Sequence, residues 1–302
     1  MIYDLIIIGA GPAGITASIY ASRYKINHLV IGEIPGGLIT EAHNVCNFPG
    51  SNETTGFDLM EKMQEHAKCL GAEILSMEKV VEIKKEEKVF TMKTESNKEF
   101  KAKTILLAIG TKPRKLGLPE EEKYLGKGLA YCATCDAMFF KDKVVAVIGG
   151  GNSALTASLY LSKVANKVSL VVRKDELRGE VVWADQVKND PKIDILYNTS
   201  VEQINGENKV ESIKLSNGKS LEVDGVFVEI GTEPKTTLSD QLAVQTDKGY
   251  IVVDQEQKTN VAGVWAAGDI TTNSAFLRQV ITACSEGAVA ADNIFSYLQK
   301  NK

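Results

Sequence analysis

The sequence lacks the features that mark membrane, secreted or nucleic-acid-binding proteins. Its longest apolar runs, such as LIIIGA and VVAVIGGG, fall far below the roughly 20 residues that span a bilayer. No basic segment precedes the apolar run at the N-terminus, as a secretory signal would require. The 35 basic and 39 acidic residues are spread without a long block of one sign, so neither nucleic acid nor a membrane surface is indicated as a partner. We expect a soluble, cytoplasmic protein.

Cysteine and histidine are scarce as well. The three histidines show no ligand spacing, and an odd count of five cysteines does not fit a secreted disulfide framework. Cys132 and Cys135 lie together in YCATCDAMFF, but they supply only half of the ligands of a structural zinc site. We therefore expect no metal and favour a redox pair, with a structural disulfide and half of a zinc site as the alternatives. Cys46, Cys69 and Cys284 stand alone, and we expect them to be small buried hydrophobes.

One local pattern, a buried strand followed by a glycine turn and an amphipathic helix, occurs twice. It appears as YDLIIIGAGPAGITASIYASRY and, roughly 140 residues later, as DKVVAVIGGGNSALTASLYLSKV. In such a turn the first Gly permits the bend, the second lets the backbone approach a pyrophosphate, and a third small residue lets helix and strand touch. One turn alone could be a mere loop, but two predict two bound dinucleotides. The two sets are Gly9, Gly11 and Gly14, and Gly149, Gly151 and Ala154.

Length and this repetition predict an α/β protein with two doubly wound, Rossmann-like (three-layer ββα) domains. A chain of 302 residues exceeds the size at which one core usually stops growing. Each glycine unit is followed by short strands that end in Gly-Thr-x-Pro, at residues 110–113 and 231–234, where we expect the chain to cross between domains. The last strand and long helix return to the first domain. We therefore predict one domain from residues 1–112 and 246–302, and an inserted domain, residues 113–245, that carries the cysteine pair.

Five motifs in this order and spacing, GAGPAG, CATCD, GGGNSA, AAGD and RQ before a final helix, closely resemble the low-molecular-weight thioredoxin reductases over essentially the whole chain. The resemblance implies a flavoprotein disulfide reductase that works as a homodimer, with FAD in the first domain and NADPH, or NADH, in the second. It implies electron transfer through FAD and the cysteine pair to thioredoxin or a glutaredoxin-like protein, with domain rotation. The alternatives are a donor such as ferredoxin or a deazaflavin, and a flavin redox sensor without turnover.

The resemblance also implies roles for the redox pair. Cys135 is the cysteine nearest the flavin, Cys132 attacks the disulfide of the protein substrate, and Cys135 resolves the mixed disulfide by thiol–disulfide exchange. Asp136 follows directly, where a carboxylic acid could move a proton to or from the departing thiolate. The alternative for Asp136 is a helix cap.

For FAD, the resemblance implies contacts from two glycine loops, the Asn of CNFPG, the AAGD turn and the RQ pair. The family's Gly-Gly-Gln is here Gly-Gly-Leu, which removes one polar contact. The implied FAD-binding residues are Gly9, Gly11, Pro12, Ala13, Gly14, Gly36, Gly37, Asn47, Gly268, Asp269, Arg278 and Gln279.

The nicotinamide side departs more from the family. Thr156 and Ala157 stand where the family typically carries Glu-Glu, and Lys174 lacks the planar fork of Arg. Cations can still bind a 2′-phosphate, so NADPH is favoured. Asp175 and Glu176 lie close enough to hold the ribose diol of NADH, which therefore stays an alternative. The alternative for RKDELR is a solvated charged turn. The implied residues are Gly149, Gly151, Asn152, Ser153, Ala154, Arg173, Lys174 and Arg178.

Overall fold

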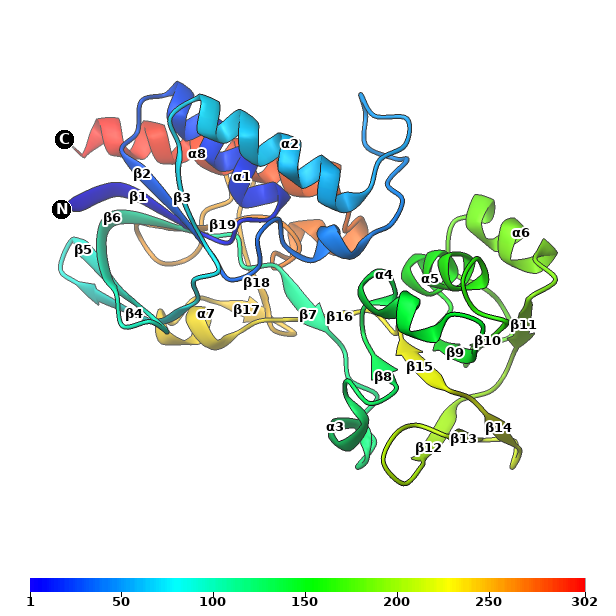
Figure 1. Ribbon diagram of the computed structural model, residues 1–302. Helices are drawn as coiled ribbons and strands as arrows, with labels where there is room; N and C mark the ends of the chain where they lie inside the picture. The colour runs from blue at the N-terminus through cyan, green and yellow to red at the C-terminus, as the bar shows by residue number, and fades with distance from the viewer. Residues whose placement is uncertain (302) are drawn as a thin grey trace. The chain divides into compact units, whose positions relative to one another are not determined.

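The computed structural model describes residues 1–301, which fall into two compact units that we describe separately (Figure 1). The first unit comprises Met1–Lys112 and the chain from Pro234 onward, and the second comprises Pro113–Glu233. The second unit is thus inserted into the first, and the chain passes between them at the two Gly-Thr-x-Pro segments.

The chain returns to the first unit earlier than the predicted boundary after residue 245. Residues 234–245 belong to the first unit because α7 (Thr237–Gln241) lies against one of its strands, where the Gln241 side chain accepts a hydrogen bond of 2.7 Å from the Ile83 backbone N–H. The apolar side chains of this segment are buried in the core of the first unit: Leu238, Leu242 and Val244.

The first unit is built on a seven-stranded sheet in the order β3-β2-β1-β6-β5-β4, with β19 also paired to β6. β1, β2, β3, β6 and β19 are parallel, and β4 and β5 extend the sheet in antiparallel fashion. Apolar sequences such as IYDLIII suit the parallel strands, because such a sheet is covered on both faces. The strands are β1 Ile2–Ile8, β2 His28–Gly32, β3 Glu73–Ser76, β4 Val80–Glu86, β5 Val89–Thr94, β6 Glu99–Leu107 and β19 Val264–Ala266.

Three helices, α1, α2 and α8, lie side by side over one face of this sheet (Figure 1). Their apolar sides and the sheet enclose one core, and a second core on the other face includes α7 and the β17–β18 hairpin. This layering agrees with the predicted fold class. The elements are α1 Pro12–Arg23, α2 Gly56–Cys69, α8 Val280–Lys300, β17 Thr246–Asp247, β18 Tyr250–Ile251, and the short helices η1 Leu38–Glu41 and η3 Asn273–Phe276.

The second unit repeats the plan on a five-stranded parallel sheet in the order β11-β10-β9-β15-β8. α5 and α6 cover one face, and the antiparallel sheet β12-β13-β14 shares a core with the other. The strands are β8 Leu129–Ala130, β9 Val144–Ile148, β10 Lys167–Val171, β11 Ile193–Leu196, β12 Val201–Asn205, β13 Ser212–Leu215, β14 Ser220–Glu222 and β15 Gly225–Val228. The helices are α3 Glu121–Tyr124, α4 Ala133–Asp136, η2 Ala137–Phe140, α5 Asn152–Ser162 and α6 Val181–Asn189.

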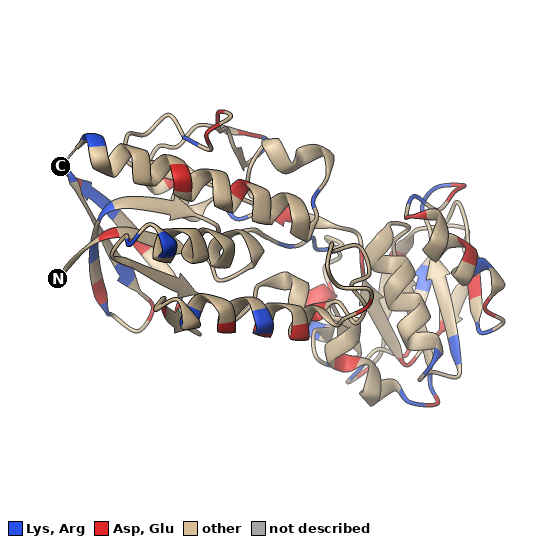
Figure 2. Cartoon of the chain, turned by 90° about the horizontal axis from the view of Figure 1, so that it is seen from above, with Lys and Arg blue, Asp and Glu red and all other residues tan. Residues whose placement is uncertain are grey.

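Two further features complete the fold. Where the chain crosses between the units, β7 (Thr111–Pro113) and β16 (Thr232–Pro234) pair as a two-stranded sheet. Acidic and basic side chains are interspersed over both units (Figure 2). Among the described residues, no helix combines the length and the apolar character needed to cross a membrane.

Candidate functional site

The two cysteines of CATC are joined by a disulfide in the second unit. Cys132 is the N-cap of the short helix α4, and its sulfur accepts a hydrogen bond of 3.1 Å from the Cys135 backbone N–H. Cys135 is exposed, whereas Cys132 is half-buried. Each sulfur is bonded to the other, whereas zinc binding requires thiolates, so this structure shows the oxidised form of the pair.

The residue before the redox pair is anchored by a buried carboxylate. The Tyr131 hydroxyl donates to Glu121, which is only 3% exposed. The two oxygens of this carboxylate also accept hydrogen bonds from the backbone N–H groups of Leu116 (2.8 Å) and Gly117 (2.9 Å). Burial, and then the Glu121 carboxylate, raise the pKa of Tyr131, so that its hydroxyl stays protonated and keeps donating. This contact fixes the chain just ahead of Cys132.

An acid and an apolar surface follow the redox pair. Burial raises the pKa of Asp136 above its ordinary value. Asp136 stands at the N-cap of η2, but among the described residues its carboxyl makes no capping hydrogen bond there. Met138 and Phe139 are 66% and 73% exposed, whereas Phe140 is buried with its ring edge-on to Phe227. The redox pair therefore adjoins an exposed apolar surface.

The first glycine turn, between β1 and α1, has room for backbone only. A Cβ at Gly9, where φ is +117°, would lie 2.0 Å from the Ala108 carbonyl oxygen, and one at Gly14 would lie 1.9 Å from the Gly9 oxygen. Gly11 is the N-cap of α1 and has no side chain to cover the first N–H groups of the helix. A Cβ at Gly37 would lie 3.1 Å from the Gly11 Cα, so the structure brings the two predicted glycine loops together.

The AAGD turn meets the same end of α1. A Cβ at Gly268 would lie 3.0 Å from the Ala13 Cβ, and one at Gly287, on α8, would lie 2.1 Å from the Ala13 carbonyl oxygen. Pro12 is the first residue of α1, where the fixed φ of proline suits a helix start. The structure thus gathers the predicted residues of the first turn and of the AAGD turn around one helix N-terminus.

Asp269 lies beside the RQ pair. Burial raises the pKa of Asp269, while Arg278 lowers it and Glu286 raises it further. The Arg278 Nε donates to the Asp269 carbonyl oxygen at 3.4 Å, and its guanidinium carbon lies 4.2 Å from the centroid of the Tyr250 ring. No motif in the sequence pointed to Tyr250.

The remaining two predicted flavin-side residues contact each other. The Asn47 Nδ2 donates to the Gln279 Oε1 at 3.1 Å, which joins the loop before α2 to the start of α8. Gln279 is the N-cap of α8, where it forms a reciprocal capping box with Thr282.

The second glycine turn, between β9 and α5, has the same design. A Cβ at Gly149, where φ is +147°, would lie 2.1 Å from the Glu229 carbonyl oxygen, and Ala154 is fully buried where helix and strand touch. Gly151 is the N-cap of α5, and a Cβ there would meet no described atom within 4 Å. Ser153 in the first turn of α5 is exposed.

A loop from β10 to α6 lies across this second turn. The Arg178 backbone N–H donates to the Gly150 carbonyl oxygen at 2.7 Å, and the predicted basic side chains Arg173, Lys174 and Arg178 are all exposed. Asn152 exchanges two hydrogen bonds with Glu180: its Oδ1 accepts from the Glu180 N–H (2.7 Å), and its Nδ2 donates to the Glu180 Oε1 (3.1 Å). Sequence reasoning missed Glu180, since its contact depends on how the loop folds.

Glu33 is a second residue that sequence reasoning missed. It follows β2 directly, where Rossmann-like domains carry an acidic residue about 20 residues beyond the glycine turn that binds a ribose hydroxyl. Its two carboxylate oxygens pair with Lys79 and Lys235, each at 3.1 Å. The spacing was visible in the sequence and could have identified it.

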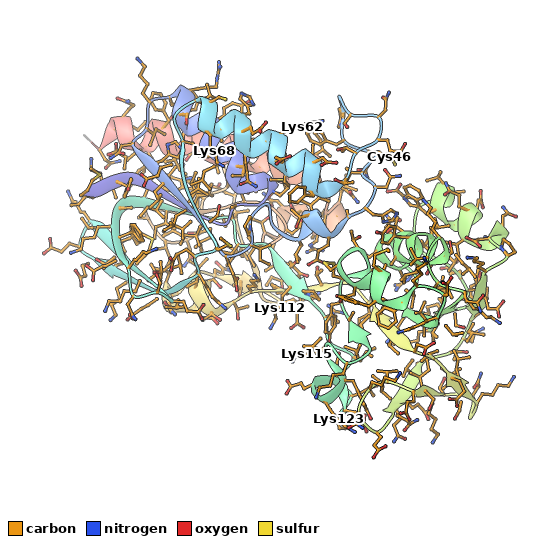
Figure 3. All side chains as sticks on the ribbon, viewed as in Figure 1. Cys46, Lys62, Lys68, Lys112, Lys115 and Lys123 are labelled. Atoms are coloured by element: carbon orange, nitrogen blue, oxygen red, sulfur yellow. A yellow bond between two sulfur atoms is a disulfide. The ribbon has the colours of Figure 1, made fainter. Side chains whose placement is uncertain are left out.

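The other cysteines differ in part from the prediction. Cys46, labelled in Figure 3, lies in the loop before α2 and is exposed, as is Cys69. Only Cys284 is half-buried, with its sulfur 3.9 Å from the Pro12 carbonyl oxygen. The prediction of buried cysteines is therefore wrong for Cys46 and Cys69. Within residues 1–301, no group of three or more His, Cys, Asp or Glu side chains could hold a metal ion.

Comparison with known proteins agrees with this architecture. The family model described as pyridine nucleotide-disulphide oxidoreductase matches residues 3–287. A thioredoxin reductase of Peptoclostridium acidaminophilum is 43% identical over 99% of this chain and 98% of its own. The crystal structure of Lactococcus lactis thioredoxin reductase is 32% identical with a TM-score of 0.94, covering 99% of both chains. A ferredoxin-flavin thioredoxin reductase from Clostridium acetobutylicum is 33% identical with a TM-score of 0.54, covering 99% of this chain and 98% of that one.

The chain therefore belongs to the pyridine nucleotide-disulphide oxidoreductase family. Within this family it is a low-molecular-weight thioredoxin reductase, which confirms the resemblance and the fold class inferred from the motifs.

Proposed function

We propose that this thioredoxin reductase passes electrons from a nicotinamide nucleotide through FAD and the Cys132–Cys135 pair to the disulfide of thioredoxin or a glutaredoxin-like protein. The observation that carries this proposal is the disulfide itself, at the start of a unit built on one glycine turn and inserted into a unit built on another. The homodimer and the cytoplasmic location stay predictions.

The residues of the first unit fit FAD. Three facts support this: a turn that a Cβ would fill, the uncapped N–H groups of α1, and the AAGD turn beside them. In this proposal residues 11–13 hold the pyrophosphate, Glu33 a ribose hydroxyl, and Asp269 the ribityl region. Arg278, with Asn47 and Gln279, holds the ring system. Bound FAD would supply the two-electron carrier between nicotinamide and disulfide.

The exchange with the protein substrate follows from ordinary thiol chemistry. The reduced Cys132 thiolate attacks one sulfur of the substrate disulfide, whose S–S bond breaks as a mixed disulfide forms. The departing substrate thiolate takes a proton, which we assign to Asp136 because burial favours its protonated form. The Cys135 thiol then gives its proton back to Asp136 and attacks the Cys132 sulfur as a thiolate, which releases the second substrate sulfur as a thiolate and restores the Cys132–Cys135 disulfide. The substrate gains two electrons and the pair loses two.

We assign the docking of the protein substrate to Met138 and Phe139. Both side chains are more than half exposed and follow the redox pair on η2. Exposed aromatic side chains next to a reactive group are typical anchors of a protein interface.

The donor we favour is NADPH. Arg173, Lys174 and Arg178 supply exposed cations on the loop that lies on the second glycine turn, as recognition of a 2′-phosphate requires. One observation favours a second candidate, a reductase fed by a protein donor such as ferredoxin: the Glu180 carboxylate is bound to Asn152 in the first turn of α5, where a negative charge opposes phosphate binding.

Trapping of the mixed disulfide tests the proposed function. The Cys135→Ser variant should accumulate a covalent adduct with oxidised thioredoxin, because it can attack through Cys132 but cannot resolve the product. Cys132→Ser is the matched control and should form much less adduct. Adducts on Cys132→Ser alone would reverse the assigned roles, and adducts on neither variant would contradict the exchange.

A further inference from the structure

Glu286 is a buried acidic residue that no motif identified. It lies on α8 with 8% of its surface exposed. Its Oε2 accepts hydrogen bonds from the Gly268 backbone N–H and the Thr271 hydroxyl, both at 2.8 Å, and its Oε1 accepts one from the Ser274 hydroxyl at 2.7 Å. Such a carboxylate is stable away from water only because these donors satisfy its oxygens.

These bonds close the AAGD turn onto α8. The Thr271 N–H donates to the Gly268 carbonyl oxygen at 2.9 Å, and the Ser274 N–H donates to the Thr271 hydroxyl at 3.3 Å, so the turn is held from within as well. The next residue of α8, Gly287, packs against the Ala13 carbonyl. Glu286 therefore sits at the level of α8 that touches the first turn of α1.

We propose that Glu286 is a positioning residue of the flavin site, which fixes the turn at residues 268–269 so that Asp269 faces the cofactor together with the first turn of α1. This inference rests on the proposed FAD site, on which Glu286 acts through the turn that it holds. The carboxylate accepts from all three groups at once, whereas a glutamine that keeps the Gly268 and Thr271 bonds would direct its amide N–H at Ser274, so that the Ser274 hydroxyl must turn from donor to acceptor and the negative charge is lost.

The charge of Glu286 gives the proposal a second readout. The charged groups that act on Asp269 are Arg278, just before α8, and Glu286, on α8. Because Glu286 raises the pKa of Asp269, its neutralisation should lower that pKa, and the acidic limb of FAD binding should move to lower pH. Asp292, on the same helix, is not among these charged groups, so its neutralisation should not move this limb.

The test measures FAD binding to apoprotein by quenching of flavin fluorescence between pH 5 and 8. We expect Glu286→Gln to weaken binding about 10-fold or more, or about 1.4 kcal/mol, and to shift the acidic limb to lower pH. The matched control is Asp292→Asn, because Asp292 lies on the same helix with its carboxylate exposed and bonded to Tyr24. The control should bind FAD as the wild type does.

A second variant covers the case in which Glu286→Gln fails to fold. Ser274→Ala removes one donor and keeps the charge, so it should weaken FAD binding severalfold and leave the acidic limb in place. Glu286→Gln, or Ser274→Ala if only that variant folds, with the affinity of the wild type would overturn the inference. Wild-type protein that binds no FAD would instead overturn the proposed function, so the two failures are distinguishable.

Discussion

A methyl group at either of two equivalent glycines should impair one of the two proposed nucleotide sites and leave the other intact. Gly151 is the N-cap of α5 with φ of −97°, and its Cβ would meet no described atom within 4 Å. Gly11, the N-cap of α1, has φ of −79° and its Cβ would lie 3.7 Å from the Gly36 carbonyl oxygen. Alanine fits both conformations, so each variant should keep its free energy of unfolding within about 0.5 kcal/mol.

In contrast, the methyl group should weaken the binding of the nucleotide at each turn. The second glycine of such a turn lets the backbone approach the pyrophosphate, and a Cβ there stands where the phosphate must pack. Gly151→Ala should weaken NADPH binding by at least about 10-fold, or about 1.4 kcal/mol, and should retain FAD. Gly11→Ala should weaken FAD binding by a similar factor.

The assay is anaerobic stopped-flow reduction of the flavin at NADPH concentrations below saturation, with the flavin content measured on each preparation. The Gly11→Ala variant, reconstituted with excess FAD, serves as the matched control for a methyl group at the other turn. Reduction of Gly151→Ala by NADPH at the wild-type rate would refute the assignment of this turn to the nucleotide.

Three further predictions follow from individual side chains. Burial lowers the pKa of His28, so below about pH 6.5 the unfolded state binds more protons than the folded state. The free energy of unfolding should therefore decrease as the pH decreases, by up to about 1.4 kcal/mol per pH unit. Urea titrations from pH 5 to 7 should show this slope, and a His28→Gln variant with the same slope would contradict it. Phe139→Ser should raise the KM for thioredoxin about 10-fold without affecting a small disulfide, whereas equal losses on both would argue against a docking role. Asp136→Asn should lower the rate of the exchange step, measured in single turnover, but leave the rate of flavin reduction unchanged; a change in flavin reduction alone would contradict the proton role.

The features that the sequence predicted best are those fixed by local sterics. Both glycine turns could be placed because the tight bend at Gly9 and at Gly149 leaves no room for a Cβ, and this requirement is written in adjacent residues. The CATC pair could be interpreted as a redox pair because the sequence offers no second pair of ligands that would complete a zinc site. The fold class followed from the repetition of these units.

The features that the sequence did not reveal depend on distant contacts. The predicted boundary at residue 245 differs from the observed return to the first unit at Pro234. The apolar pattern of α7 shows that this helix is buried, but it does not show which unit provides the core. The pairing of Tyr131 with Glu121 and the three bonds to Glu286 join segments whose approach is set only by folding. The exposure of Cys46 depends on a loop that has no periodic pattern. Glu33 is the exception, because its distance in sequence from the first glycine turn was sufficient to identify it.

The most direct test of the central claim is a reductive titration of the holoenzyme with dithionite under anaerobic conditions. A disulfide takes up two electrons, so the wild-type chain should consume two electrons more than its bound flavin alone requires, and the Cys132→Ser, Cys135→Ser double variant should lack this excess. Equal consumption by the two proteins would mean that the Cys132–Cys135 pair does not exchange electrons with the flavin and would contradict the account.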